Sequence, residues 1–146
     1  MKIAPKTSEK LRQVALHISK IQDDVIEATA IAAKMYYDKL LAYHFKSNNY
    51  KALSPEYKKW KDKHYPGKPI LVATGELRDA TLRTGKVVKY KKSVKLVFDL
   101  PDYGEYVMIE RDFLTPTAEE FILVINRIDK ELQRISKRRQ QEVNRK

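Results

Sequence analysis

Cysteine is absent from this chain of 146 residues. Its absence excludes disulfide bonds, thiolate nucleophiles and cysteine-ligated zinc sites, and it fits a reducing cytoplasm. Long apolar runs are also missing, since no stretch approaches the ~20 apolar residues that a membrane-spanning helix needs. The first ten residues, MKIAPKTSEK, contain no apolar core of the kind found in secretory signals, so we do not expect secretion by a signal peptide.

Recognisable catalytic and metal-binding motifs are missing as well. The three histidines, His17, His44 and His64, stand far apart, and none has a partner at the spacing of known metal motifs. The sequence contains no P-loop and no serine in a nucleophile elbow. The adjacent carboxylates Asp23 and Asp24 point to different faces of a helix. We therefore predict that the chain is not an enzyme and has no catalytic residue, cofactor or metal ion.

The bulk composition indicates one globular domain with a highly charged surface. A length of 146 residues matches the range of about 100–200 residues for a single domain. Apolar residues make up 42% and charged residues 34% of the chain, which excludes a disordered composition. We expect one domain over residues 1–146.

The net charge of +11 is unevenly distributed along the chain. Residues 46–68, 83–95 and 130–146 carry +5, +6 and +5, whereas residues 96–120 carry −6. Three interpretations are open. In the first, the basic segments bind nucleic acid. In the second, the acidic segment contacts a basic segment of a neighbouring copy. In the third, the charges only keep the surface hydrated.

Residues 8–45 are predicted to form one long helix, because they contain neither glycine nor proline and their apolar residues recur at alternating steps of three and four. Such a helix is about 55 Å long. It exceeds the diameter of a compact domain of this size, so part of it is expected to pack on another chain. The alternative is a bend or break near 36–39. The stripe consists of Leu11, Val14, Ile18, Ile21, Val25, Ala28, Ala32 and Met35.

Two short helices are predicted next. Ser54 is a capping residue, and Pro55 occupies the first helical position, where its missing N–H costs nothing. Thr74 is expected to cap a further helix that runs to about Leu82, with Gly85 as its stop signal.

After Gly85 the apolar period changes to two, which favours strands over 86–90 and 94–100 and a third strand over 103–109. A last helix is expected after Thr115 and Pro116, where Thr117 and Glu120 have capping-box spacing. Its apolar stripe ends at Ile135, so we expect a frayed basic tail from about 137. The predicted fold class is α+β, with a long N-terminal helix, two short helices, a three-stranded antiparallel meander and a C-terminal helix.

The segment 53–82, LSPEYKKWKDKHYPGKPILVATGELRDATL, resembles the central signature of phage virion-morphogenesis or tail-completion (head–tail joining) proteins. In that family an LSP.Y...K helix leads to an IL..TG.LRD helix, and a tyrosine-containing strand and an R.F element follow. The Gly-rich loop that the family has before the R.F element is missing here. The matching residues are Leu53, Ser54, Pro55, Tyr57, Thr74, Gly75, Leu77, Arg78 and Asp79, followed by Tyr103, Arg111 and Phe113.

The resemblance implies a structural protein of a phage or prophage. Such proteins are non-enzymatic and form homo-oligomeric rings, often hexamers, at the neck or tail end of the particle. It implies other phage neck and tail proteins as partners, with neither a membrane nor a small-molecule substrate. It also implies a location in the host cytoplasm during assembly and in the virion afterwards.

For a ring, we expect opposite charges on the two different surfaces that meet between neighbouring copies. The acidic region 99–120 of one copy would then face the basic region 83–95 or 46–68 of the next, and high salt should weaken the ring. The candidate interface charges are Lys86, Lys89, Lys91 and Lys92 on the basic side, and Asp99, Asp102, Glu105, Glu110 and Asp112 on the acidic side.

The alternative function is a small basic nucleic-acid-binding protein. Arg138, Arg139 and Arg145 in the C-terminal tail are candidates for phosphate contacts, and the tyrosine- and lysine-rich stretch around Trp60 is a candidate for base stacking. The same tail is also explained as a solvated extension, and the same aromatic residues as core and interface. Non-specific DNA contact is compatible with a ring as well, since phosphate contacts carry no sequence information.

Overall fold

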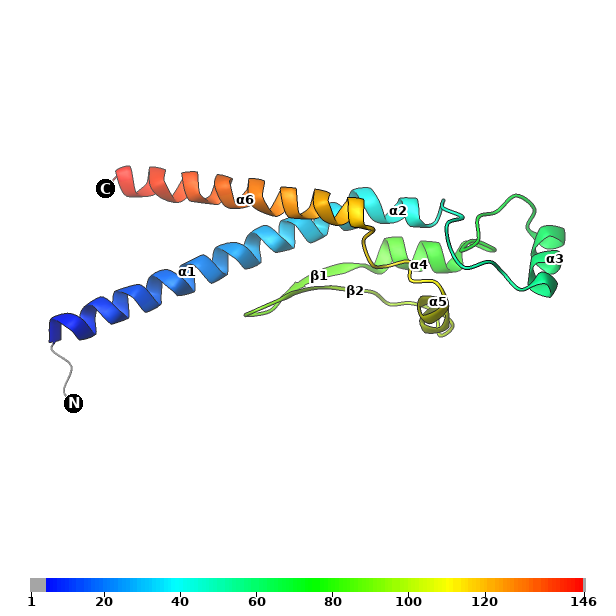
Figure 1. Ribbon diagram of the computed structural model, residues 1–146, viewed down its shortest axis with the longest axis horizontal. Helices are drawn as coiled ribbons and strands as arrows, with labels where there is room; N and C mark the ends of the chain where they lie inside the picture. The colour runs from blue at the N-terminus through cyan, green and yellow to red at the C-terminus, as the bar shows by residue number, and fades with distance from the viewer. Residues whose placement is uncertain (1–4, 146) are drawn as a thin grey trace.

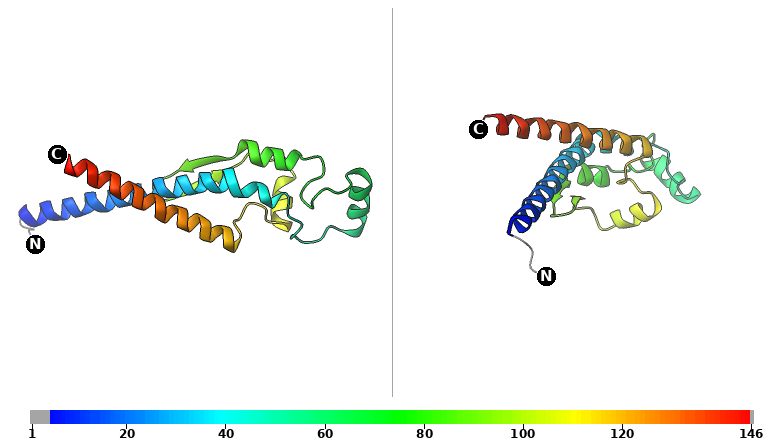
Figure 2. Two further views of the ribbon diagram at one scale, coloured as in Figure 1. Left: turned by 90° about the horizontal axis from the view of Figure 1, so that it is seen from above. Right: turned by 60° about the vertical axis from the view of Figure 1, so that its left-hand side comes forward.

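The computed structural model describes residues 5–145, with side chains from Ser8 to Arg145. Figure 1 shows a body at one end of the molecule, from which the two long helices α1 and α6 extend to the same side, and Figure 2 shows that they cross at an angle and diverge toward their free ends. The elements in chain order are α1 (Pro5–Met35), the π-helical turn η1 (Tyr36–Leu40), α2 (Leu41–His44), α3 (Pro55–His64), α4 (Glu76–Thr84), β1 (Lys86–Lys89), β2 (Val94–Val97), α5 (Gly104–Glu110) and α6 (Ala118–Asn144). The predicted α+β class is confirmed.

The predicted long helix is present as a rod made of α1, η1 and α2. At the place where we considered a break, the backbone N–H of Leu41 donates to the carbonyl of Tyr36, five residues earlier. Such a π turn inserts one extra residue without interrupting the helix. The neighbouring rings of Tyr36 and Tyr37 are both buried there, so the rod turns its aromatic side chains into the body at this point.

The two short helices begin close to the predicted positions. Ser54 Oγ accepts a hydrogen bond from the N–H of Tyr57 at 3.3 Å, as expected for a cap. The cap of α4 is Gly75 rather than the predicted Thr74, and Gly75 has a φ of +90°, which a side chain would oppose. Thr74 still contributes, because its Oγ1 accepts from the N–H of Glu76 at 3.2 Å.

The predicted third strand is wrong. The sheet among the described residues is the antiparallel hairpin β1–β2, in which Lys86 pairs with Val97 and Lys89 with Val94. Residues 104–110 form helix α5 instead, and its sheltered positions 104, 107 and 108 follow a helical period. The four consecutive apolar residues 106–109 carry no strand-like alternation, so the period of two found in residues 94–100 does not extend to this segment.

The predicted frayed tail from about 137 is also wrong. Thr117 and Glu120 form the capping box that their spacing predicted, and α6 then continues to Asn144. Arg139 Nη2 contacts Asp24 Oδ1, and Arg138 Nη2 lies 3.7 Å from Glu27 Oε1. These pairs hold the C-terminal half of α6 against α1, so the segment remains helical beyond the end of its apolar stripe.

Two apolar clusters form the core. The first joins Phe45 and Phe113 to the chain around α4, including Leu71, Val72 and Leu77. The second is built on Tyr36, Tyr37 and Leu41, against which the hairpin and Val124 of α6 pack. Both clusters lie in the body, so neither covers the N-terminal half of α1.

Gly85 allows the hairpin to approach the rod. Tyr37 Oη donates to the carbonyl of Leu82 and accepts from the N–H of Gly85 at 3.2 Å. A Cβ atom at position 85 would lie 2.1 Å from Cε2 of Tyr37, and the backbone there has an ordinary negative φ. Close packing rather than backbone conformation therefore requires this glycine.

We predict that Gly85→Ala lowers the free energy of unfolding by about 1–3 kcal/mol or more, because the methyl group displaces a buried ring. Urea unfolding measures this. Gly67→Ala is the matched control: Gly67 has a φ of +74° and open space around it, so only the backbone cost of about 1 kcal/mol applies. A Gly85→Ala loss no larger than that of the control would contradict this packing.

Candidate assembly surfaces

A partly open groove of about 750 Å³ lies between α3, α4 and α5. Its walls are mostly apolar and aromatic, including Trp60, Tyr65 and Val107, with charged groups such as Glu110 at its edge. The structure brings eight of the twelve predicted motif residues to this groove, although they come from distant parts of the chain. These eight are Leu53, Ser54, Tyr57, Thr74, Gly75, Leu77, Tyr103 and Arg111.

Two polar motif residues hold the groove in shape. The guanidinium of Arg111 donates to the carbonyl of Lys51 at 2.7 Å and to that of Ala52 at 2.9 Å, which fastens the loop before α3. Tyr103 Oη donates to Glu76 Oε2 at 3.1 Å, across the gap between α5 and α4. Burial and then this contact raise the pKa of Tyr103 to about 12. Both groups are therefore engaged in intrachain structural contacts.

The other four motif residues lie outside the groove. Pro55 opens α3, and Phe113 is fully buried with its ring centroid 5.5 Å from that of Phe45. Arg78 and Asp79 form an adjacent pair at 3.2 Å. The Arg78 side chain folds over Gly75, where a Cβ would lie only 2.8 Å from Arg78 Nη2. These residues shape α3, α4 and the core.

Aromatic rings are stacked along α3. The Trp60 ring lies 5.7 Å from Tyr57 and 4.7 Å from His64, and Trp60 remains about half exposed. Tyr36 and Tyr37, at the other end of the tyrosine-rich stretch, are buried in the core. The α3 part of that stretch and Tyr43 of α2, which is 61% exposed, are thus accessible to a partner.

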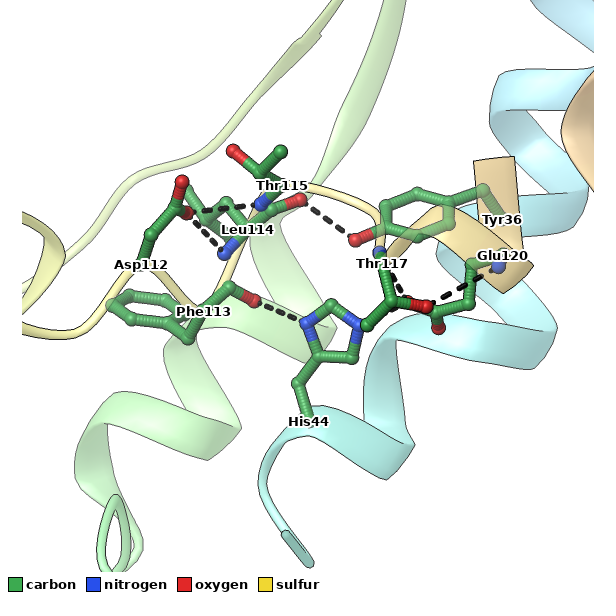
Figure 3. A network of polar contacts seen from close by, with 8 residues as sticks. All are labelled: Tyr36, His44, Asp112, Phe113, Leu114, Thr115, Thr117 and Glu120. Carbon is green, nitrogen blue, oxygen red and sulfur yellow. Dashed lines mark hydrogen bonds and ion pairs between the residues drawn. The ribbon is translucent and has the colours of Figure 1, made fainter. Parts of the chain in front are cut away.

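A polar network joins the end of the rod to the start of α6 (Figure 3). His44 Nδ1 lies 2.8 Å from the carbonyl oxygen of Phe113, and Nε2 lies 2.6 Å from Oε1 of Glu120. Both partners are acceptors, so a ring that satisfies both carries a proton on each nitrogen. The geometry therefore fits a charged imidazolium that faces an ionised carboxylate.

The surroundings favour the ionised form of both carboxylates in this network. Burial alone would raise the pKa of Glu120, but hydrogen bonds from Thr117 and His44 outweigh it and lower that pKa. Asp112 behaves likewise, because its Oδ1 accepts from the N–H groups of Leu114 and Thr115 at 3.1 and 3.0 Å. Tyr36 donates to the Leu114 carbonyl at 2.7 Å, which fixes the same turn.

The predicted interface charges separate into two groups. Lys86 and Lys89 on β1 and Lys91 and Lys92 in the hairpin turn are exposed. Among the side chains of residues 8–145, these lysines and Asp99, Asp102 and Glu105 form no ion pair. Glu110 is paired with Lys51 at 2.6 Å, and Asp112 is occupied in the turn described above.

The predicted phosphate contacts are also divided. Arg138 and Arg139 lie in the ion pairs that hold α6 to α1, whereas Arg145 is exposed at the end of the helix. Arg139 Nε is buried without a hydrogen-bond partner. Two of the three arginines thus already have anionic partners in their own chain.

Sequence reasoning did not identify which apolar residues remain uncovered. In α1 the stripe is fully buried at Ala28 and Ala32, but its five earlier members, Leu11, Val14, Ile18, Ile21 and Val25, are between 40% and 55% exposed. Apolar residues are also exposed at the start of α6, and Ile109 of α5 is 81% exposed. The periodicity of the sequence identified the apolar stripe, but only the tertiary structure shows which of its residues no other element covers.

The part of the chain with described residues contains no group of three or more His, Cys, Asp or Glu side chains that could hold a metal ion. Within the same part, no helix has the length and apolar character needed to cross a membrane. No protein-family model, no curated protein and no solved structure matches the chain.

We predict that Glu120→Gln lowers the free energy of unfolding by about 1–3 kcal/mol at pH 7, because the ionised carboxylate that pairs with His44 is replaced by a neutral amide. Since the folded-state pKa of Glu120 is lowered, its stabilising effect is present above its ordinary value near 4.5 and is lost as the pH falls through the folded-state pKa. Urea unfolding at several pH values measures the difference between the two proteins.

The control is Glu119→Gln, which makes the same charge change at an exposed neighbouring position. Its effect should stay within about 0.5 kcal/mol. Equal effects of the two substitutions at pH 7 would rule out a special contribution from the His44–Glu120 pair.

Proposed function

We propose that this chain is a structural, non-enzymatic subunit that assembles with copies of itself. More specifically, we propose a ring-forming tail-completion or neck (head–tail joining) protein of a phage or prophage, as the resemblance of segment 53–82 implies. The observation that carries the proposal is the uncovered apolar stripe in the first half of α1. Exposed apolar surfaces of this kind mark sites of protein association.

The surface area supports association. The chain exposes 11327 Å², whereas a compact monomer of its mass, 17.1 kDa, exposes about 7,800 Å². The excess of about 3,500 Å² is more than the roughly 1,600 Å² that two standard interfaces, at about 800 Å² per partner each, would remove from one subunit. A ring subunit has two such neighbours.

The groove supports a structural rather than a catalytic role. Its charged groups already have partners within the chain: Glu76 accepts from the Tyr103 hydroxyl, Glu110 pairs with Lys51, and Arg111 donates to two carbonyl groups. A general base or nucleophile would need a group with a suitably tuned pKa and access to substrate, but the raised pKa of Tyr103 moves it away from that role. A groove built in this way suits an apolar segment of a protein partner, such as another neck or tail protein.

In this proposal the protein acts in the host cytoplasm during particle assembly and then remains in the virion. Opposite charges on neighbouring copies contribute to the ring, with the exposed hairpin lysines on one side and Asp99, Asp102 and Glu105 on the other. The contact has no need for a cofactor.

One observation favours the alternative, a nucleic-acid-binding protein. The hairpin turn presents Lys91 and Lys92 without intrachain carboxylate partners among the described side chains, and Trp60 presents an exposed stack beside the lysines of α3. Cations beside accessible rings are typical of single-strand binding surfaces.

The proposed function predicts the effect of removing this gene from its phage or prophage. Heads filled with DNA and separate or defective tails should accumulate, because only the joining step is blocked, and infectious particles should fall by several orders of magnitude. Electron microscopy and plaque counts of the lysate measure both. Restoring the gene in trans is the control, and complete, infectious particles without the gene would contradict the proposal.

The double variant Lys91→Glu/Lys92→Glu separates the two functions. For a ring subunit, the variant should assemble less well, because two cations that face a neighbour's acidic region are reversed. For a nucleic-acid binder, it should instead lose DNA affinity and lower the salt slope by about two, with its mass unchanged. Sedimentation and DNA titration of the same samples measure both, and the second pattern would favour the alternative.

A further inference from the structure

We infer that the uncovered stripe of α1 docks on the uncovered N-terminal face of α6 in a second copy of the chain. This inference rests on the proposed function, since it requires self-association, and it specifies which two surfaces meet. We call them the α1 stripe (Leu11, Val14, Ile18, Ile21, Val25) and the α6 face (Phe121, Ile122, Ile125).

The α1 stripe continues a surface that already packs on α6. Ala28 and Ala32 belong to the same series of three- and four-residue steps and are fully buried where α1 and α6 lie together. Toward the N-terminus α6 no longer covers this face, and Ile18 and Ile21 are 52% and 48% exposed. The first half of α1 therefore presents the same kind of surface as the second half, without the helix that covers it.

The α6 face likewise consists of apolar residues that no other helix of the same copy covers. Ile135 is buried at the contact with α1, and the apolar stripe extends from it toward the N-terminus of α6. At that end Phe121 and Ile125, four residues apart on one face, are 55% and 47% exposed, and Ile122 beside them is 58% exposed. This face thus lacks an apolar helix against it.

One copy cannot bring these two surfaces together. The two helices run antiparallel, with Asp24 beside Arg139 and with Val124 packed on the Tyr36 cluster. Leu11 lies about 13 residues before Asp24, and Phe121 lies about 18 residues before Arg139, in opposite directions from the ion pair. At 1.5 Å per helical residue, these roughly 31 residues place Leu11 and Phe121 about 45 Å apart along the helices. Figures 1 and 2 show the same arrangement, with the start of α1 at the free end and the start of α6 at the body.

Charge favours this pairing over contact between two α1 stripes. Residues 8–25 of α1 carry three basic and three acidic residues, and Asp24 is paired with Arg139 of its own copy, which leaves a net charge of +1. Residues 117–126 carry two acids and no basic residue, and Glu120 is paired with His44 of its own copy, which leaves the exposed Glu119. Two α1 stripes would bring like net charges together, while an α1 stripe and an α6 face bring opposite charges together. Because the two surfaces differ, the contact is heterologous, and its repetition generates a ring or a filament.

Cysteine cross-linking tests the contact directly, since the chain contains no cysteine of its own. Full-length Ile18→Cys and Ile125→Cys are mixed, oxidised gently and digested, and the disulfide-linked peptides are identified by mass spectrometry. We expect the disulfide-linked peptide that joins α1 to α6 to form in about tenfold higher yield than in the control pair, because docking raises the local concentration of the two thiols. Only docked positions satisfy disulfide geometry.

The control pair is Leu16→Cys with Leu123→Cys. These residues are 54% and 50% exposed, much like the test pair, but they lie on the opposite faces of the same two helices. A yield equal to that of the control overturns the inference. Stronger cross-linking of Ile18→Cys with itself also overturns it and indicates contact between two α1 stripes instead.

The oligomeric mass of the same cysteine variants, measured under reducing conditions, distinguishes a failure of this inference from a failure of the proposed function. An oligomer without the α1–α6 cross-link would overturn the inference and leave self-assembly standing. A monomer at every concentration would overturn both.

Discussion

The rod formed by α1, η1 and α2 extends beyond the body that packs on its C-terminal end (Figure 1), and much of the structure depends on this overhang. The body buries the end of the rod through Tyr36, Tyr37 and Leu41, and α6 covers its middle at Ala28 and Ala32. The first half of α1 extends beyond both. An amphipathic helix owes most of its stability to packing of its apolar face, and our proposal therefore places a partner there.

The position of α6 decides which apolar residues stay uncovered. At one end its capping box holds Thr117 and Glu120, and Glu120 is tied to His44 at the end of the rod. At the other end Arg138 and Arg139 contact carboxylates of α1. Fixed at both ends, α6 leaves its own Phe121 face open and stops short of covering the α1 stripe. The charged residues therefore determine where the exposed apolar surfaces lie, and these are the surfaces through which we propose that the chain associates.

Periodicity and capping chemistry predicted most of the helices, because these signals are local. The 3-4 stripe of α1, the Ser54 cap and the Thr117–Glu120 box each depend on residues within a few positions of one another. The errors arose where distant contacts decide. Buried Gly104 lies against Leu77 of α4, and Asp24 holds Arg139 in a helix. The sequence identified the motif residues but could not predict the groove that they line. The groove depends on segments that are remote in sequence and that bring Leu53 and Arg111 together.

The central claim is that copies of this chain cover one another's apolar surface. Sedimentation equilibrium of the purified chain over a wide range of protein concentration tests it most directly. The account predicts a mass that rises to a discrete multiple of 17.1 kDa and that returns to the monomer value in Ile18→Asp but not in Leu16→Asp. A mass of one subunit at every concentration would contradict it.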